Sequence, residues 1–598
     1  MVKTTLVFFA VTVVAILPSN AGTFYAAPTA LVDPDNPNYC QLPECAGTLQ
    51  DAVYMATNDC DFTEVVLADG TYHADWNWKG LEIQFIRRGY EIKNNKIINF
   101  DINFTNLTVR SASGDPTRCV IDGGGSADRH RCFYLSCDIS CQKPYLAQFT
   151  VSGITFRNFH LDAEGTSLQK GAVIYAGGEE MSYNVENCVF EDCVSGKLGA
   201  AVDWESNGGR SAGGAIYAYG NEYNVEDLGY YWFRVKDSMF RKCHSAGTGA
   251  AICAKKRLLV SDCRFEGCIS SNSVPDVSYY AGTVAYDARG NEKGVIIMPV
   301  SWASNCVFRD NFCYSAREMR GGAVHNLNTY RCKFYNNGCH GSVGGYGGTI
   351  WGYNDADKFA HIEDEVDNSD RPPEWSFHQS ELRGGRYYRC RFGGSNRVEA
   401  TESTLSGNIS SFYNCLFQDF YYYNYKPTRA INCTFARCRW GNHSWNGFFM
   451  EKGVMINSAM LECESMNGCI VEYTNEGFHG YAAGGVAMTN SVYYASEAKR
   501  IHPDWGEKGN NTWYRPGEVP GQAGTQYYSY LNPASSTDPF RPARDCYLVD
   551  KGIKLEGMDV KGDLMSRDLI GNPRCVGGAP DIGCYEYYVK PGISVMLR

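Results

Sequence analysis

Short segments of alternating apolar and polar positions recur along most of the chain, and each has Cys and Phe two residues apart. The residue between them varies among Val, Arg, Lys, Leu and Thr. Alternate side chains of a strand point to opposite faces, so this pattern predicts strands with one constant, buried face and one solvated face. The pairs are Cys188 and Phe190, Cys263 and Phe265, Cys306 and Phe308, Cys332 and Phe334, Cys390 and Phe392, Cys415 and Phe417, and Cys433 and Phe435; Ser238 and Phe240 keep the pattern with Ser for Cys.

The spacing of the segments predicts a solenoid. Phe240 and Phe265 are 25 residues apart, and Phe308 and Phe334 are 26 apart. One coil of a β-helix needs about this length, whereas propeller blades need roughly 40 residues or more. We therefore expect an all-β fold, a right-handed parallel β-helix in which equivalent residues stack about 4.8 Å apart. The step of 58 residues from Phe334 to Phe392 allows two coils, or one coil with a long loop.

Turn signals flank the strands. Cys or Asn follows the Phe by three residues in most copies, as at Cys193, Asn311 and Asn337, and small or Asn residues suit a turn that leaves the strand. Glycine signatures such as Gly214-Ala215-Ile216 and Gly322-Ala323-Val324 lie between the Cys segments and predict a bend followed by another strand.

The 26 cysteines have two predicted roles. Stacked Cys on neighbouring coils have parallel Cβ vectors, so we expect a column of unpaired, buried thiols. Its members are Cys188, Cys263, Cys306, Cys332, Cys390, Cys415, Cys433 and Cys463. The cluster Cys119, Cys132, Cys137 and Cys141 predicts two local disulfides rather than a zinc site, because it lacks paired Cys-x-x-Cys knuckles.

The first 110 residues predict a signal and a cap. Residues 1–21 have Lys3, a short apolar run and small residues, which is typical of a secretory signal peptide. In residues 48–56, Leu49, Ala52, Val53 and Ala56 share one helical face, and Thr48 suits the N-cap. Residues 65–72 predict a strand, an Asp-Gly turn and a second strand. Such an element closes the open end of a solenoid.

Three resemblances accompany these patterns. The Gly-Gly-Ala-Ile and Phe-x-x-Asn pairs resemble the repeats of polymorphic outer-membrane proteins, and the helix followed by residues 67–72 is similar to the opening of pectate-lyase-like β-helices. The stretch from Asp568 to Glu586 resembles the choice-of-anchor Q signature. Together they imply a signal peptide at 1–21, a cap with the first coils at 22–110, a β-helix with loop insertions at 111–495, and a choice-of-anchor Q-like region at 496–598.

Charge and hydropathy restrict the partners. The net charge of −11 gives no reason to expect a nucleic acid partner. After the leader, no apolar stretch has the length of a membrane span, so we expect an exported monomer, secreted or at the cell surface. The acidic stretch from Trp351 to Trp375 predicts a surface loop. Calcium binding by the carboxylates of this loop is a more specific alternative. The order of the acidic residues does not match an EF-hand loop, and no cofactor is predicted.

A candidate site follows from the strand register. Arg331 and Lys333 flank one buried Cys, and Arg389 and Arg391 flank the next recognised one. If these coils stack directly, four cations form one outer patch, with Trp351 and Tyr388 close in sequence. Guanidinium groups bind carboxylates or sulfates and aromatic rings pack on sugars, which predicts a groove for an acidic polysaccharide. The alternative is that the acidic segment from Glu363 to Asp370 neutralises the patch.

Three classes of function fit these patterns. A binding or structural module for acidic polysaccharide comes first. A polysaccharide lyase that cleaves uronate-containing glycans is the second, because such enzymes need a base and a cation beside the uronate carboxylate. An adhesin is the third, since a repeat core with variable loops needs no catalytic residues. We find no polygalacturonase set and no Ser-His-Asp or His-Glu-x-x-His context, so no catalytic residue is predicted.

Overall fold

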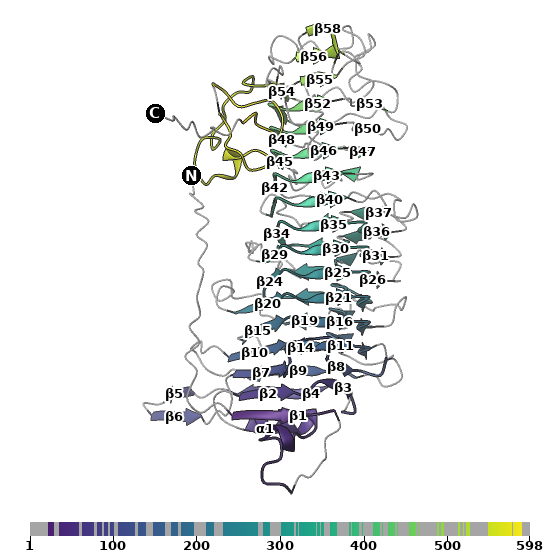
Figure 1. Cartoon of the computed structure of the whole chain (residues 1–598), viewed down its shortest axis with the longest axis vertical. Helices are drawn as coiled ribbons and strands as arrows, with labels where there is room; N and C mark the ends of the chain where they lie inside the picture. The colour runs from purple at the N-terminus through teal and green to yellow at the C-terminus, as the bar shows by residue number, and fades with distance from the viewer. Residues whose placement is uncertain are drawn as a thin grey trace, which may run out of the picture.

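The fold is a stack of parallel coils, seen in a computed structural model of the 598-residue chain (Figure 1). The residues that the structure describes are 22–28, 35–58, 63–76, 80–86, 89–93, 96–100, 106–125, 130–138, 147–161, 169–177, 181–196, 211–219, 231–272, 279–280, 282–286, 301–315, 318–320, 322–341, 344–346, 349–351, 359–367, 382–383, 386–393, 397–398, 411–418, 421–422, 429–436, 439–440, 454–461, 464–465, 487–489, 492–494, 512–514, 518–519, 522–526, 548–576 and 578–588.

Three long parallel sheets form the walls of the stack, and each coil gives a strand to each sheet in turn. Sheet A contains β1 (Gly22–Ala26), β2 (Thr63–Leu67), β7 (Asn106–Ser111), β10 (Ala147–Ser152), β15 (Met181–Glu186), β20 (Trp232–Lys236), β24 (Arg257–Ser261), β29 (Trp302–Ser304), β34 (Asn328–Tyr330), β39 (Ala360–Ile362), β42 (Arg386–Tyr388), β45 (Ser411–Tyr413), β48 (Arg429–Ile431), β51 (Val454–Ile456) and β54 (Ala487–Thr489).

From β2 onward, a strand of sheet B follows each strand of sheet A. It contains β3 (Gly70–His73), β8 (Cys119–Asp122), β11 (Thr155–Arg157), β16 (Val189–Glu191), β21 (Met239–Arg241), β25 (Arg264–Glu266), β30 (Val307–Arg309), β35 (Lys333–Tyr335), β40 (Glu365–Asp367), β43 (Arg391–Gly393), β46 (Leu416–Gln418), β49 (Thr434–Ala436), β52 (Ala459–Leu461), β55 (Val492–Tyr494) and β56 (Thr512–Tyr514).

Sheet C closes each coil. It contains β4 (Leu81–Ile86), β9 (Phe133–Asp138), β14 (Ile174–Ala176), β19 (Ile216–Ala218), β23 (Ile252–Ala254), β28 (Val284–Tyr286), β33 (Val324–His325), β38 (Ile350–Trp351), β41 (Leu382–Arg383), β44 (Arg397–Val398), β47 (Tyr421–Tyr422), β50 (Arg439–Trp440) and β53 (Glu464–Ser465).

Smaller sheets complete the structure. A further parallel sheet contains β12 (His160–Leu161), β17 (Val194–Ser195), β22 (His244–Ser245), β26 (Ile269–Asn272), β31 (Phe312–Ser315) and β36 (Gly338–Gly341). Short parallel sheets pair β13 (Gln169–Lys170) with β18 (Ser211–Ala212), and β27 (Tyr279–Tyr280) with β32 (Glu318–Arg320) and β37 (Gly344–Tyr346). Two antiparallel pairs are β5 (Gly89–Lys93) with β6 (Lys96–Phe100), and β57 (Glu518–Val519) with β58 (Gln522–Gln526). The predicted right-handed parallel β-helix is therefore confirmed.

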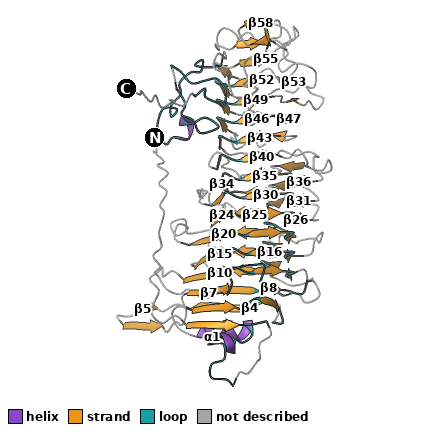
Figure 2. Cartoon of the chain, in the orientation of Figure 1, coloured by secondary structure: helices purple, strands orange, loops and turns teal. Residues whose placement is uncertain are grey.

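The N-terminal helix closes one end of the stack, as Figure 2 shows. Helix α1 (Leu49–Asn58) begins after Thr48, whose hydroxyl accepts a hydrogen bond from the Asp51 amide at 3.0 Å, so the predicted N-cap is confirmed. The four predicted apolar residues of its face are buried against β1, β2 and β4. The turn η1 (Pro43–Cys45) precedes the helix, and η9 (Leu564–Ser566) lies near the C-terminus.

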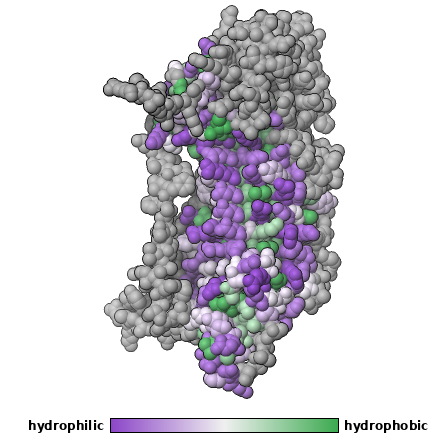
Figure 3. All heavy atoms as spheres, in the orientation of Figure 1, coloured by the Kyte–Doolittle hydropathy of each residue, from purple (hydrophilic) through white to green (hydrophobic). Residues whose placement is uncertain are grey.

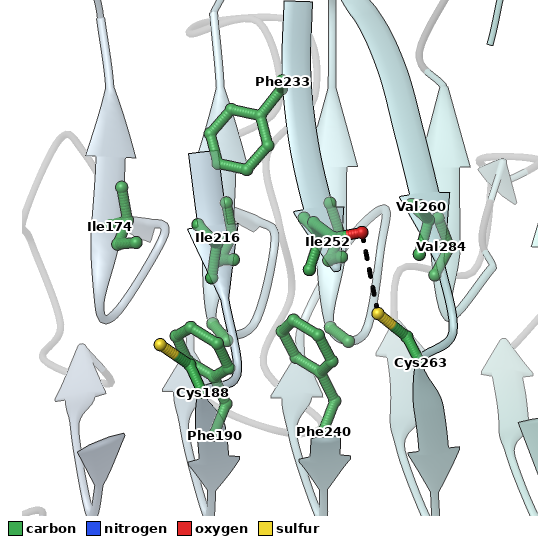
Figure 4. Close-up of a cluster of buried hydrophobic side chains, with 14 of the residues drawn as sticks. Ile174, Cys188, Phe190, Ile216, Phe233, Phe240, Ile252, Val260, Cys263 and Val284 are labelled. Carbon is green, nitrogen blue, oxygen red and sulfur yellow. Dashed lines mark hydrogen bonds between the residues drawn. The ribbon is translucent and has the colours of Figure 1, made fainter. Parts of the chain in front are cut away.

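Stacked phenylalanines form the core, and Figure 4 shows part of it. Phe190, Phe240, Phe265, Phe308 and Phe334 are fully buried, and neighbouring rings lie 4.6 to 5.0 Å apart and nearly parallel. Each ring repeats in register because β16, β21, β25, β30 and β35 pair in parallel. The shared core is continuous along the axis, as a solenoid requires.

The predicted thiol column is confirmed in the described residues. All its described cysteines are buried and free; Cys463 lies outside the described residues. Each thiol contacts backbone carbonyls, as Cys263 does toward Val235 O and Ser261 O. The two local disulfides are not formed, because Cys119 and Cys132 are both free: Cys119 lies at the start of β8, in line with this column. The side chains of Cys137 and Cys141 lie outside the described residues.

The turn from sheet A to sheet B uses a left-handed backbone residue directly before the thiol column. These residues, here called the corner column, have φ between 48 and 56°. Asn and Asp tolerate this conformation better than other side chains. The corner column consists of Asn187, Asp237, Asp262, Asn305, Arg331, Glu363, Arg389, Asn414, Asn432 and Asn457. A second left-handed residue follows sheet B, one position before the Cys or Asn that the sequence pattern had placed in the turn.

The described part of the acidic stretch after Trp351 is part of the stack, whereas a surface loop was predicted. Its described residues, 359–367, form β39 and β40, which pair with the coils before and after them. Val366 takes the place of the Phe in this coil and is buried. The 58-residue step from Phe334 to Phe392 is therefore two coils, one of the two alternatives that the spacing allowed.

Candidate functional site

The four predicted cations lie on the sheet A to sheet B turn and on the outer face of sheet B, but their coils do not stack directly. Lys333 pairs in register with Glu365, and Glu365 pairs with Arg391. Likewise Glu363 lies between Arg331 and Arg389 in the corner column, through successive backbone hydrogen bonds. The condition for one patch of four cations, direct stacking of these two coils, is not met, because the coil with β39 and β40 lies between them.

Acidic side chains of that middle coil pair with the cations. Glu363 bonds Arg331 Nε and Arg389 Nη2, each at 2.6 Å, and Glu365 lies 3.5 Å from Lys333 Nζ. Partial burial raises the pKa of Glu363, but hydrogen bonds from Arg331 and Arg389 outweigh burial and hold the pKa below its usual value. The contacts match the alternative in which the acidic segment neutralises the patch, although a coil supplies the charges.

The two pairs of cations differ in exposure. The side chains of Arg331 and Lys333 are 59% and 54% exposed, whereas Arg389 is 8% exposed. Tyr388 lies half-buried on the outer side of sheet A, stacked on Tyr413 at 4.9 Å. Trp351 is in β38 of sheet C, and its side chain lies outside the described residues. The structure therefore keeps Arg331 and Lys333 together at the surface and separates them from Trp351.

The outer face of sheet B carries a ladder of charges that the sequence pattern had not shown. One column alternates in sign through Asp122, Arg157, Glu191, Arg241, Glu266 and Arg309. Two neighbouring pairs form ion pairs at 2.7 Å, Arg157 with Asp122 and Arg241 with Glu191. The ladder ends at Tyr335, whose ring lies 5.1 Å from the Arg309 guanidinium. Opposite charges one coil apart neutralise most of this column.

Arg264 and Arg309 are the exception on this face. Both are exposed, and neither forms an ion pair with a described residue. Arg264, Val307 and Lys333 occupy one column on three successive coils, and Arg309 is on the same strand as Val307. These residues, with Arg331 and Tyr335, are here called the sheet B face. Figure 3 shows that the described part of the surface in this view is largely hydrophilic.

The C-terminal block, residues 548–576 and 578–588, packs against the sheet A to sheet B turn of the later coils (Figure 1). Arg389 Nη1 donates to Leu564 O at 3.0 Å, and Asn414 Nδ2 donates to Arg567 O at 3.0 Å. Asn457 and the backbone of Ile553 exchange two hydrogen bonds, at 2.7 and 2.8 Å. The block therefore forms hydrogen bonds with corner-column side chains of several coils.

Asn432 links the other two corner amides. Its Nδ2 donates to Asn414 Oδ1 at 3.0 Å, and its Oδ1 accepts from Asn457 Nδ2 at 3.1 Å. Asn432 is fully buried although it begins an Asn-x-Thr sequence. The Asn432 side chain therefore has a structural role in the folded protein.

Residues of the choice-of-anchor Q-like signature form the core of the block. Arg574 bonds Glu586 Oε2 at 3.3 Å and Asn414 Oδ1 at 3.1 Å, and its side chain is inaccessible to solvent. Asp568 and Asp581 accept backbone N–H groups, and both are buried. Burial raises the pKa of Asp568, of Glu586 and, to about 7, of Asp581. The signature residues thus hold a buried polar core together.

One polar cluster lies inside the stack, in the coil where Val366 takes the position of the stacked Phe. Asp364 replaces Cys in the thiol column, and its carboxylate accepts the Cys332 amide at 2.8 Å and hydrogen-bonds Thr329. Thr329 Oγ1 also lies 2.7 Å from His361 Nδ1. Burial raises the pKa of Asp364 to about 7 and lowers that of His361 to about 3. A pattern that requires Cys and Phe does not reveal this cluster; the signal in the sequence is Asp at a Cys position.

Neither a metal site nor a membrane-spanning helix is found in the described part of the chain. No group of three or more His, Cys, Asp or Glu side chains there could hold a metal ion. No helix in the described ranges is both long and apolar enough to cross a membrane.

Comparisons with known proteins show likeness of structure. No family model and no curated protein matches the chain, so the resemblances to polymorphic outer-membrane and choice-of-anchor Q proteins stay predictions. Similar solved structures include pectate lyase Pel9A, with 10% identity and a TM-score of 0.25 over 96% of this chain and 98% of that one. They also include a polysaccharide lyase from Pseudopedobacter saltans, with 10% identity and a TM-score of 0.27 over 78% and 92%.

The Dettilon tailspike protein is a third similar structure, with 8% identity and a TM-score of 0.26 over 78% of this chain and 69% of that one. Likenesses at these TM-scores carry no argument about function. What the chain does must therefore be argued from its own side chains.

Proposed function

We propose that this chain is an exported β-helix protein that binds an acidic polysaccharide on the sheet B face. The observation that carries the proposal is the exposed pair Arg264 and Arg309, which form no ion pair with any described residue of a chain with net charge −11. Guanidinium groups bind carboxylate and sulfate oxygens through paired N–H donors. Two such groups on adjacent coils are an anion-binding arrangement.

The neighbouring cations support the same assignment. Arg331 and Lys333 each have one acidic partner, but both side chains are more than half exposed. Exposed ion pairs contribute about 0–1 kcal/mol, so a polyanion can exchange for Glu363 or Glu365 at little cost. Arg389 and Arg391, which belong to the patch predicted from the sequence, are left out of this surface because the C-terminal block contacts both.

The spacing of the face suits a chain of sugars. Parallel strands repeat every ~4.8 Å, which is close to the length of one pyranose along a glycan. Val307 and Tyr335 are partly exposed between the cations and offer apolar surface to a sugar ring. A uronate polymer lying along the stack would therefore meet a cation or an apolar contact on each coil from Arg264 to Lys333.

The test compares binding and cleavage on the same polymers. The mature protein is applied to immobilised polygalacturonate, alginate, chondroitin sulfate and a neutral glucan, and absorbance of unsaturated uronates is followed in parallel. We expect salt-sensitive retention on an acidic polymer without absorbance growth. Growth would make the protein a lyase, and equal retention on the neutral glucan would remove the electrostatic argument.

Matched variants locate the surface. Arg309→Ser and Arg264→Ser should each weaken retention, and the double variant should abolish it. Arg234→Ser is the control, because Arg234 is also exposed and lies 5.5 Å from the Trp232 ring, but on sheet A. Equal losses from Arg234→Ser and Arg309→Ser would show that net charge, and not the sheet B face, governs retention.

A further inference from the structure

The C-terminal block covers the continuation of the sheet B face. Lys333, Glu365, Arg391, Leu416 and Thr434 occupy one column on successive coils. Lys333 is exposed, whereas Leu416 and Thr434 are buried. Arg391 Nη1 donates to Tyr585 Oη at 3.3 Å, and the Cys584 amide donates to Thr434 Oγ1 at 3.0 Å. The column is therefore open up to Lys333 and covered by the block from Arg391 onward.

The corner column changes in the same place. Arg331 is exposed, but Arg389, two coils later, is almost completely buried and donates to the backbone of Leu564. Both arginines bond the same Glu363. The block therefore contacts the second pair of cations, Arg389 and Arg391. In the described residues it forms no hydrogen bond with the first pair, Arg331 and Lys333.

The chemistry of the block resembles that of an acidic ligand. Its described residues include seven acidic and five basic side chains, a formal charge of −2. Where it meets Arg391 it offers the hydroxyl of Tyr585, and hydroxyls are also groups that a guanidinium would meet on a bound glycan.

Hydrogen bonds join the block to the stack, next to buried apolar side chains such as Leu416 and Cys584. The corner amides, Thr434 and the two arginines bond backbone or hydroxyl groups of the block. Each such bond contributes modestly because water replaces it when the surfaces separate. The block also has an internal core of its own, around Arg574, Asp568 and Glu586. On leaving the stack the block gives up the bond from Arg574 Nε to Asn414 Oδ1, but it keeps the bonds of Arg574 to Glu586 and Tyr585 O and of Asp568 to the Glu586 amide.

We propose that the C-terminal block is a releasable cover that occupies the upper end of the sheet B face and competes there with an acidic glycan. This inference rests on the proposed function for its ligand. When the cover leaves, Arg389 and Arg391 join Arg331 and Lys333, and the cationic face extends by two coils. The block thus limits the length of glycan that the closed protein holds.

The experiment loosens the cover in the full chain. Thr434→Val keeps the shape of the side chain and removes the acceptor of the Cys584 amide. Thr155→Val is the control, since Thr155 lies in the same column of sheet B and its hydroxyl bonds Pro116 O, far from the block. Ile553→Pro, which removes the amide that Asn457 accepts, gives a second loosened form. Hydrogen exchange of residues 548–588 measures release without any glycan.

Retention on immobilised polygalacturonate and alginate measures the consequence. We expect faster exchange in 548–588 with unchanged exchange in 231–272, and retention several-fold stronger in the loosened forms than in the parent or in Thr155→Val. In the Thr434→Val background, Arg391→Ser should remove the gain in retention.

Three results would refute the proposal that the C-terminal block is a releasable cover. Unchanged exchange in both loosened forms would show that the block does not release. Faster exchange with unaltered retention would reject the competition while the parent's own retention upholds the proposed function. Absence of retention in the parent and in every loosened form would reject both proposals together.

Discussion

Replacing Asp364 with Asn should remove a pH dependence from the stability of the β-helix. Asp364 is the one described carboxyl in the thiol column, fully buried between Cys332 and Cys390. Its pKa is raised from 3.8 to about 7, chiefly by burial. Each pKa unit corresponds to ~1.36 kcal/mol, so ionised Asp364 costs the folded state about 4 kcal/mol relative to the unfolded chain.

The sign follows from proton binding. The unfolded chain releases the Asp364 proton near pH 3.8, whereas the folded protein keeps it until about pH 7. Between these values the folded state binds more protons, so the free energy of unfolding falls as the pH rises. Below this window the contribution is constant, and above it the full cost is present. His361 stays neutral throughout the window, because burial lowers its pKa to about 3.

Asn fits the same contacts without a charge. Its carbonyl oxygen can accept the Cys332 amide, and its amide group can donate to Thr329, both of which Asp364 now contacts. We therefore expect Asp364→Asn to match the parent near pH 4 and to exceed its unfolding free energy by up to about 4 kcal/mol at pH 8.

Guanidinium unfolding of parent and variant, followed by circular dichroism from pH 4 to pH 8.5, measures this difference. Asp367→Asn, on the partly exposed side of β40, is the matched control. The reasoning is refuted if the difference between Asp364→Asn and the parent does not change with pH, or if Asp367→Asn shows the same change. Other buried carboxyls, such as Asp581, contribute equally to both proteins and cancel in the comparison.

Three other predictions follow from the same contacts. Phe308→Ala should lower the unfolding free energy by roughly 3–5 kcal/mol in denaturant titration, because it opens a gap in the ring stack, whereas Arg309→Ala on the exposed side should change it by less than about 0.5 kcal/mol. Glu363→Ala should cost about 3 kcal/mol, because it removes the carboxylate partner of buried Arg389, and Glu365→Ala, which opens an exposed pair, about 0–1 kcal/mol; equal costs would contradict the burial argument. The buried column thiols should not react with a thiol reagent until denaturant is added, since burial raises their pKa and excludes the reagent; rapid reaction of the native protein would show an open core.

The fold was predictable because one local pattern sets it. Alternation of Cys, a variable residue and Phe defines a strand face, and a step near 25 residues defines a coil. The free thiols followed from the same register, since parallel Cβ vectors disfavour disulfides. The coil of Asp364 and Val366 was not identified because Asp and Val stand at the Cys and Phe positions of the pattern, and its acidic residues resembled a loop.

The candidate site was less predictable, for a geometric reason. The register correctly placed Arg331 and Lys333 at the surface, but exposure of Arg389 depends on a segment more than 150 residues later in the chain. A strand pattern reports which face a side chain occupies, not what packs on that face. The positive φ of Arg331 and Arg389 was not predictable from residue type. Asn and Asp occupy most equivalent positions and favour this conformation, whereas Arg does not signal it.

The C-terminal block has a consequence for how the molecule comes apart. In a solenoid each coil contacts only its neighbours, so unfolding can begin at an end and advance coil by coil. The block bonds Arg389, Asn414, Thr434 and Asn457, which belong to successive coils. Loss of one of these coils therefore weakens the hold of the block on the others. While the block is seated, the later coils should melt as one cooperative unit, and release of the block removes this coupling, whereas the coils near α1 lose structure independently.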